Sequence, residues 1–350
     1  MRVSVLDQSP IPAGSTGADA LRNSVDLARL ADTLGYHRYW VAEHHGTPML
    51  ACASPEALIG PIAALTSRMR VGSGGVMMPH YSPLKVAETF SMLSALFPRR
   101  VDLGVGRAAG TDSLTMFALQ RDRRQAVPDD FPQQLAELLG YVRDGLPAGH
   151  RFEHLTELPG LPERPEPWLL GSSPQSGVWA ARAGLPYAFA DFISPAGADI
   201  VAEYRDRFQP SASQPDPYVM VAAWALCADS DDEARRLASS ARMAFTLMRQ
   251  GHLISIPPVE TALRFFEDSG PATASITRRR RWILGSPDTV RRDLDELVQE
   301  YQADELMIVT ITHDHQARRR SYELLGGVTA AMPQPGAREP TRRTATMRTR

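Results

Sequence analysis

Three side chains that can hold or transfer a proton stand at the end of a short apolar segment. The segment reads Trp-Val-Ala-Glu-His-His, so Glu43, His44 and His45 follow a strand-like run. An imidazole titrates near neutral pH, so a histidine here could act as a general acid or base. Zinc or iron would also accept these ligands, but successive residues of a strand point to opposite sides. His44 and His45 are therefore not expected to bind one ion together, and a structural, hydrogen-bonded histidine is the alternative.

Two further turns combine glycine with groups that could contact a flat or anionic ligand. Gly74 and Gly75 lie inside the strand-like run VGSGGVMM. Glycine there marks a bulge or the close approach of a flat ligand, and a simple bulge is the plainer interpretation. Arg107 follows Gly104 and Gly106 in GVGR. A guanidinium in such an uncrowded place could hold a phosphate bidentately.

A serine-rich turn, GSSPQS, precedes a helix-like stretch and contains Ser173 and Ser176. Hydroxyl and free N–H groups at a helix N-terminus form a phosphate site, whereas ordinary capping by Ser173 is the alternative. The turn and Arg107 together favour an anion site.

Eight apolar segments of strand length alternate with segments of helical period. This alternation predicts parallel strands with right-handed crossovers, and eight such strands close a barrel. An open doubly wound sheet is the rival, but the chain reads Asp-Gln-Ser-Pro after the first strand rather than G-x-G-x-x-G. We therefore predict an α/β fold, a (β/α)8 TIM barrel, with its active site at the carboxyl ends of the strands. The expected strands are Val3–Leu6, Tyr39–Ala42, Val71–Met77, Val101–Val105, Trp168–Leu170, Tyr187–Ala190, Tyr218–Leu226 and Leu306–Ile311.

The expected helices begin and end at recognisable residues. Asp19–Leu34 has an apolar period and stops at Gly35, a favourable C-cap residue. Four later helices are expected to start at a Ser-Pro pair, with serine as the cap and proline in the first turn. These pairs begin at Ser54, Ser82, Ser173 and Ser286.

Two long segments interrupt the repeat, and we expect insertions after strands 4 and 7. The first is Gly106–Pro128, and the second is Gln250–Gly285 with the basic run Arg278–Arg281. Long loops on this side of a barrel are commonly lids, so we predict a mobile lid over the ligand for the second segment. Its arginine run is interpreted as a solvated surface in preference to a ligand clamp. Residues 1–330 should form one barrel domain, and the charged, proline-containing stretch 331–350 should be a disordered tail.

Composition excludes several classes of protein. The 350 residues carry a formal net charge of -2, so no overall basic field attracts nucleic acid. No apolar run is long enough for a membrane span or a signal peptide. Two cysteines, Cys52 and Cys227, exclude a disulfide framework and favour a reducing cytoplasm. The histidines show no metal-binding spacing, so no metal site is predicted.

The motifs, taken in order, resemble those of the bacterial luciferase-like flavin monooxygenases. The resemblance rests on VAEHH, VGSGGVMMPHYSPLKVAE, DLGVGR, LLGSSPQSGVWAARAGLP and GSPDTVRRDLDEL, and it covers roughly Met1 to Gly326. The stretch GRAAGTD resembles a bacterial subgroup found in secondary metabolism.

The resemblance implies roles for individual residues. His44 matches the histidine proposed as catalytic base near the reacting flavin. Gly74-Gly75 matches a non-prolyl cis peptide that lies against the isoalloxazine ring. Gly106 replaces the reactive cysteine of luciferases proper, so light emission is not implied. The phosphate-binding positions are matched by Arg107, Ser173 and Ser176.

The activity implied is that of a two-component monooxygenase acting on a small organic molecule. It would use O2 and reduced FMN (FMNH2) delivered by a separate NAD(P)H:flavin reductase, and the protein would be a homodimer. Three alternatives stay open: a deazaflavin (F420)-dependent oxidoreductase that transfers hydride, a flavin-binding protein without turnover, and a metal-dependent hydrolase using Glu43 and His44.

Overall fold

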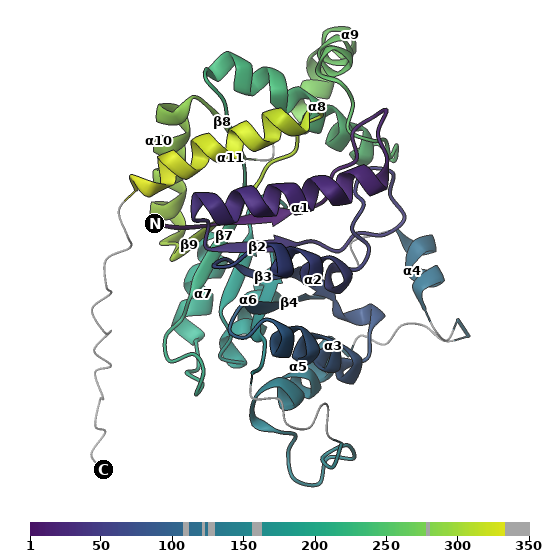
Figure 1. Cartoon of the computed structure of the whole chain (residues 1–350), viewed down its shortest axis with the longest axis vertical. Coiled ribbons are helices and arrows are strands. Elements are labelled where there is room, and N and C mark those ends of the chain that lie inside the picture. The colour runs from purple at the N-terminus through teal and green to yellow at the C-terminus, as the bar shows by residue number, and fades with distance from the viewer. Residues whose placement is uncertain (108–111, 121–122, 125–129, 156–162, 278–280, 333–350) are drawn as a thin grey trace.

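Parallel strands close into a barrel that is surrounded by helices (Figure 1). The computed structural model describes residues 1–107, 112–120, 123–124, 130–155, 163–277 and 281–332. Around the barrel the strands follow the order β1, β2, β3, β4, β5, β6, β7, β9, and β9 pairs again with β1. The predicted TIM barrel is thus confirmed. The eight barrel strands are β1 Arg2–Asp7, β2 Arg38–Val41, β3 Arg70–Met77, β4 Val101–Gly106, β5 Glu166–Gly171, β6 Tyr187–Ala190, β7 Val219–Cys227 and β9 Glu305–Val309.

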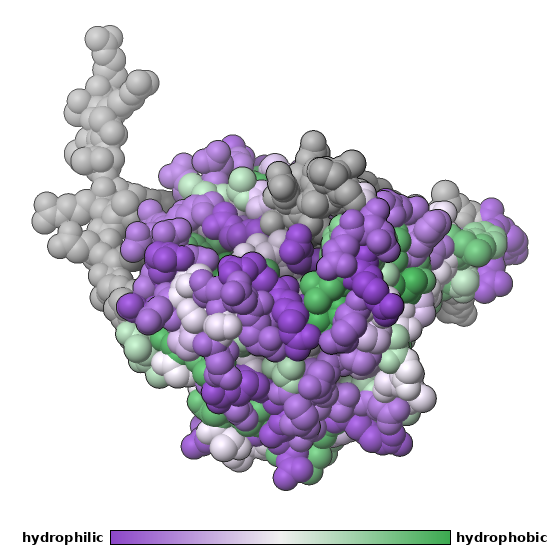
Figure 2. Space-filling view, turned by 90° about the horizontal axis from the view of Figure 1, so that it is seen from above, coloured by the Kyte–Doolittle hydropathy of each residue, from purple (hydrophilic) through white to green (hydrophobic). Residues whose placement is uncertain are grey.

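The helices form the outer layer of the molecule, where α1 and α11 lie side by side (Figure 1). No helix in the described ranges is long and apolar enough to cross a membrane, and hydrophilic residues cover most of the face in Figure 2. The helices are α1 Gly17–Leu34, α2 Pro55–Leu65, α3 Pro83–Leu96, α4 Ser113–Leu119, α5 Phe131–Leu139, α6 Pro174–Arg182, α7 Ala198–Arg207, α8 Asp231–Arg249, α9 Val259–Thr277, α10 Pro287–Tyr301 and α11 His315–Ala330, with short turns η1 Met78–His80 and η2 Gly140–Asp144.

The helix boundaries follow the expected residues closely. α1 ends at Gly35 in the left-handed conformation, with φ of 82°, which glycine adopts at little cost. All four Ser-Pro pairs start helices, but only the hydroxyl of Ser173 caps its helix with a hydrogen bond. Helix α1 begins at Gly17, two residues before the predicted start at Asp19. The reason is a reciprocal capping box, in which Thr16 is the N-cap residue and Asp19 is its partner.

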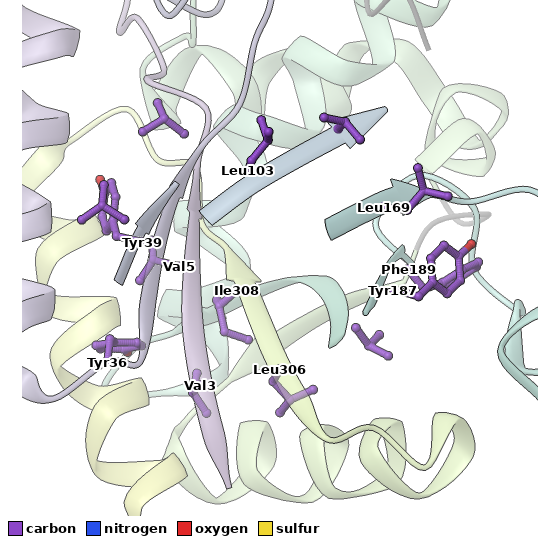
Figure 3. Packing of buried hydrophobic residues seen from close by; sticks show 14 of the residues in the cluster. Val3, Val5, Tyr36, Tyr39, Leu103, Leu169, Tyr187, Phe189, Leu306 and Ile308 are labelled. Carbon is purple, nitrogen blue, oxygen red and sulfur yellow. The ribbon is translucent and has the colours of Figure 1, made fainter. Parts of the chain in front are cut away.

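Alternate residues of each strand face two different layers. Val3 and Val5 of β1, with Tyr39 of β2, pack outward against the helices (Figure 3). Leu6 and Trp40, one position away on the same strands, point into the barrel. Because of this two-residue period, the register of the strands decides which side chains point into the barrel.

A buried ionic network fills the opposite, N-terminal end of the barrel. Arg38 pairs with Asp102 at 2.9 Å and with Glu305 at 3.2 Å. Arg70 and the indole N–H of Trp40 also donate to Asp102, at 2.7 and 2.8 Å. Burial alone would raise the pKa of Asp102, but the two guanidinium groups outweigh it and hold the pKa below its usual range.

The two insertions occur where they were expected. The chain between β4 and β5 holds α4 and α5, and the chain between β7 and β9 holds α8, α9, a ninth strand and α10. That strand, β8 Trp282–Gly285, was not predicted. This strand extends the sheet by pairing with the C-terminal half of β7.

The C-terminal part of the domain closes against its N-terminus. The ammonium group of Met1 donates to the carbonyl of Met332 at 3.0 Å, and the Met332 side chain is buried. This contact joins the first residue of the chain to residue 332, and the predicted domain boundary at residue 330 stays a prediction. Residues 333–350, where the disordered tail is predicted, lie outside the described residues.

Candidate active site

A cavity of about 770 Å³ opens at the carboxyl ends of the barrel strands. All six predicted site residues line it: His44, Gly74, Gly75, Arg107, Ser173 and Ser176. Every barrel strand contributes at least one lining residue, which is where barrel enzymes build their sites. Apolar side chains make up most of the remaining wall: Leu6, Trp40, Ala42, Val76, Met77, Leu169, Leu170, Ala188, Ala190, Phe192, Ala222 and Met307 among them.

The two adjacent histidines have different surroundings, as their strand positions predicted. His44 lines the cavity, whereas His45 lies outside its lining and contacts the carboxylate of Glu43 at 2.7 Å. The same buried carboxylate accepts from the backbone N–H of Met77 at 2.9 Å and from the hydroxyl of Tyr81 at 3.0 Å. Glu43 therefore ties the end of β2 to the end of β3 and to the turn beyond it.

His44 is half-buried, and its Nδ1 atom makes no hydrogen bond to the part of the chain that the structure describes. Burial, helped by the neighbouring charge of His45, lowers the pKa of His44 to about 4. The imidazole is consequently neutral near pH 7, and the residue forms part of the cavity wall.

This lowered pKa predicts an acid-dependent loss of stability. A histidine that titrates near 6.5 when unfolded and at about 4 when folded binds its proton in the unfolded state first, as the pH falls. The free energy of unfolding should therefore drop between pH 7 and pH 5, with roughly 1–2 kcal/mol of that drop due to His44. Urea unfolding at both pH values should show a smaller drop in His44→Ala. An identical drop in the variant would mean that the pKa of His44 is not lowered.

The peptide bond between Gly74 and Gly75 is cis, as the resemblance implied. A β-carbon on Gly74 would lie 2.5 Å from Leu6 Cδ1, and one on Gly75 would lie 2.7 Å from the carbonyl oxygen of Gly104. The pairing of β3 with β4 shifts at this point, so the bulge is also confirmed. The absence of side chains leaves bare backbone as this part of the cavity wall.

Arg107 and the serine turn meet at the β4–β5 side of the cavity. The guanidinium of Arg107 is exposed and lies 5.8 Å from the ring centroid of Trp179. Ser173 is exposed at the N-terminus of α6, whose first N–H groups carry a partial positive charge. Ser176 is buried, and its hydroxyl shares a 2.9 Å hydrogen bond with Tyr187. The turn therefore combines capping, the plainer interpretation, with a cationic surface suited to an anion.

The comparisons with known proteins agree with this geometry. The family model described as luciferase-like monooxygenase matches residues 1–305. The chain belongs to the luciferase-like monooxygenase family. It is accordingly an enzyme, an oxidoreductase of the monooxygenase kind.

Individual members of the family match over nearly their whole length. A luciferase-like monooxygenase of Escherichia coli is 41% identical, with 92% of this chain and 95% of the relative covered. The N-acetyl-S-alkylcysteine monooxygenase of Bacillus subtilis is 36% identical, with 95% and 99% covered.

Two solved structures share the barrel. The structure of apo-MsnO8 is 41% identical and superposes with a TM-score of 0.87, covering 95% of this chain and 99% of that one. The oxygenating constituent of 3,6-diketocamphane monooxygenase from Pseudomonas putida, solved with FMN, has a TM-score of 0.71 at 19% identity, with 96% and 99% covered. The second likeness supports the fold alone.

In this luciferase-like monooxygenase, the described part of the segment predicted to be a lid does not line the cavity. Helix α9 packs against α8, and no described residue of 250–285 lines the cavity. Arg281 contacts Glu300 at 2.7 Å and Asp191 at 3.4 Å, so its charge is used within the fold. Residues 278–280 are outside the described ranges. Helix α9 thus lies beside α8 and its described residues line no part of this cavity, and the mobility predicted for the segment stays a prediction.

Several lining residues of this family member were not singled out from sequence. Gln8 follows β1 directly, so its place at a strand end was a usable signal. Met116 of α4 and Trp179 of α6 come from helices, whose contribution to the wall depends on how the loops fold back. In the described ranges, no group of three or more His, Cys, Asp or Glu side chains could hold a metal ion.

Proposed function

We propose that the protein is the oxygenating component of a two-component flavin monooxygenase. It would receive reduced FMN from a separate NAD(P)H:flavin reductase and use O2 to oxygenate a small organic molecule. The observation that carries the proposal is the convergence of an arginine and a helix N-terminus, a bare backbone wall and a neutral histidine in one cavity. Ligand cavities of such proteins commonly measure 300–1,000 Å³, and about 770 Å³ lies within that range.

The chain's polar groups fit the phosphate of FMN. Arg107 would pair with the phosphate oxygens, while Ser173 and the N–H groups of α6 would donate to them. Ser176 is bonded to Tyr187, so we assign it to holding this turn in shape.

The other walls fit a flat ring system in a dry surrounding. The backbone of Gly74 and Gly75 can approach a planar ligand because neither residue has a side chain. Reduced flavin supplies the oxygen chemistry, and the protein's part is to bind, orient and shield it. Apolar walls such as Trp40 and Met77 exclude water, and the neutral imidazole of His44 can accept a proton from a reacting group.

The test of the phosphate site is Arg107→Ala. Losing charge-assisted hydrogen bonds should weaken FMN binding by about 1.5–3 kcal/mol, or roughly tenfold to 150-fold. Flavin fluorescence titration measures the change. Arg182→Ala removes an exposed arginine at the far end of the same helix and should leave the affinity as it is. Equal affinities for all three proteins would remove Arg107 from the flavin site.

The alternatives differ in measurable ways. Turnover with F420 and not with FMNH2 would support the deazaflavin oxidoreductase. FMN binding without product, with a reductase present and metabolite extracts as substrate, would support a flavin-binding protein. The homodimer, the cytoplasmic location and the role in secondary metabolism stay predictions, and sedimentation velocity tests the first of them.

A further inference from the structure

The cavity contains a second polar corner on the side away from Arg107. Gln8 follows β1 and His44 follows β2, whereas Arg107 and Ser173 follow β4 and β5. Because strand order around the barrel equals sequence order here, the two corners lie on different walls, separated by β3 and its cis peptide. The Gln8 corner is thus distinct from the proposed phosphate site.

Strand register fixes the direction of the side chains in this corner. Leu6 pairs with Trp40 across β1 and β2, and both point into the barrel. Gln8 and Ala42 come two residues later on each chain, so they continue on the same face, and His44 comes two residues after Ala42. All five of these side chains line the cavity.

The Gln8 side chain is buried without its full set of partners. Only 5% of the residue is exposed, and its Oε1 atom has no hydrogen bond to any described residue. The Nδ1 atom of His44 is likewise buried and has no hydrogen bond to any described residue. A buried polar atom without a hydrogen-bond partner costs about 1–3 kcal/mol. Because both residues line one cavity, a bound molecule toward which these side chains turn is the natural source of the missing partners.

The charges around this corner select the kind of molecule. Gln8 is uncharged, and His44 is neutral near pH 7. The nearby Glu43 carboxylate already accepts from three donors. An anion buried here would therefore lack a counter-charge, which is costly in an apolar cavity. Glu43 also lines the cavity, but both of its oxygens are already hydrogen-bonded within the fold, so the corner favours a neutral molecule.

We propose that Gln8, with His44 beside it, is a specificity-determining residue that binds a neutral hydrogen-bond donor of the organic substrate, an amide N–H or a hydroxyl. The rest of that substrate contacts apolar side chains, including Ala188, Ala190 and Ala222, whose small size leaves room on the β6–β7 side. The assignment to substrate, and not to the polar edge of a flavin, rests on the proposed function.

A matched pair of probes tests the corner without knowledge of the substrate. Benzamide and acetophenone have the same shape, but only benzamide carries N–H donors. The wild-type protein saturated with FMN should bind benzamide about three- to tenfold more tightly than acetophenone, measured by saturation-transfer NMR titration. Gln8→Met keeps the length of the side chain and should abolish the preference.

Gln134→Met is the control, because its Oε1 is likewise buried without a partner, yet the residue does not line the cavity. It should keep the wild-type preference. Equal binding of both probes to the wild type, or an unchanged preference in Gln8→Met, would overturn the proposal. The wild-type comparison alone decides this if Gln8→Met does not fold.

Flavin titration of the same proteins shows whether Gln8 contacts the substrate or the flavin. FMN affinity within about twofold of wild type in Gln8→Met supports a substrate contact. A tenfold weaker FMN affinity with an intact probe preference would place Gln8 against the flavin and overturn the assignment. A preference for benzamide in apoprotein that binds no FMN would refute the proposed function and leave the polar corner standing.

Discussion

His44→Ala should lower the rate of the oxygenation step by about 100- to 10,000-fold, the range typical for loss of a positioned acid or base. Its ring lines the cavity at the end of β2, and its Nδ1 makes no hydrogen bond to the rest of the described chain. The side chain therefore contributes little to the fold near neutral pH, and the melting temperature should change by only a few degrees. Single-turnover measurements with FMNH2 and O2 separate this effect from flavin binding.

His252→Ala provides the comparison for this experiment. His252 is exposed and does not line the cavity, so both rate and stability should match the wild type. If His44→Ala instead melts far below the wild type while its folded fraction oxygenates normally, His44 is a structural residue.

Arg38→Ala should destabilise the barrel by about 3–5 kcal/mol, the scale for removing one member of a buried ion pair. Asp102 and Glu305 are fully buried and would be left without their main counter-charge. Urea unfolding of the variant should show a lower midpoint at pH 7.

The matched change is Arg22→Ala, which breaks an exposed pair with Asp19. Exposed pairs contribute at most about 1 kcal/mol, so this variant should unfold near the wild-type midpoint. A similar small effect for both arginines would show that the buried network is not needed for stability.

The sequence predicted those parts of the fold that depend on local pattern. The eight barrel strands are apolar runs bounded by turn residues, and Ser-Pro pairs mark four helix starts. β8 escaped prediction because it follows a run of arginines inside a segment interpreted as an insertion. Its position depends on Trp282 stacking against Trp224, 5.2 Å between centroids, which no local pattern reveals.

For the site, the sequence predicted which residues line the cavity but not the contacts that they make. His44, Arg107 and Ser173 lie within three residues of the ends of their strands, so position in the motif was enough to place them at the cavity. The role of Glu43 as an acceptor for three donors was not predictable, because two of these donors, Met77 and Tyr81, lie 34 and 38 residues away. The unsatisfied oxygen of Gln8 is likewise a property of packing and cannot be read from residue type.

The Glu43 junction has a consequence for engineering the enzyme. His45 and Tyr81 do not line the cavity themselves, but both contact the Glu43 carboxylate, which joins the wall carrying His44 to the wall carrying the cis peptide. Substitutions there would tilt the two walls relative to one another without adding or removing volume in the cavity. Directed evolution for altered reactivity could therefore draw useful variants from outside the cavity, where saturation libraries limited to lining residues would not search.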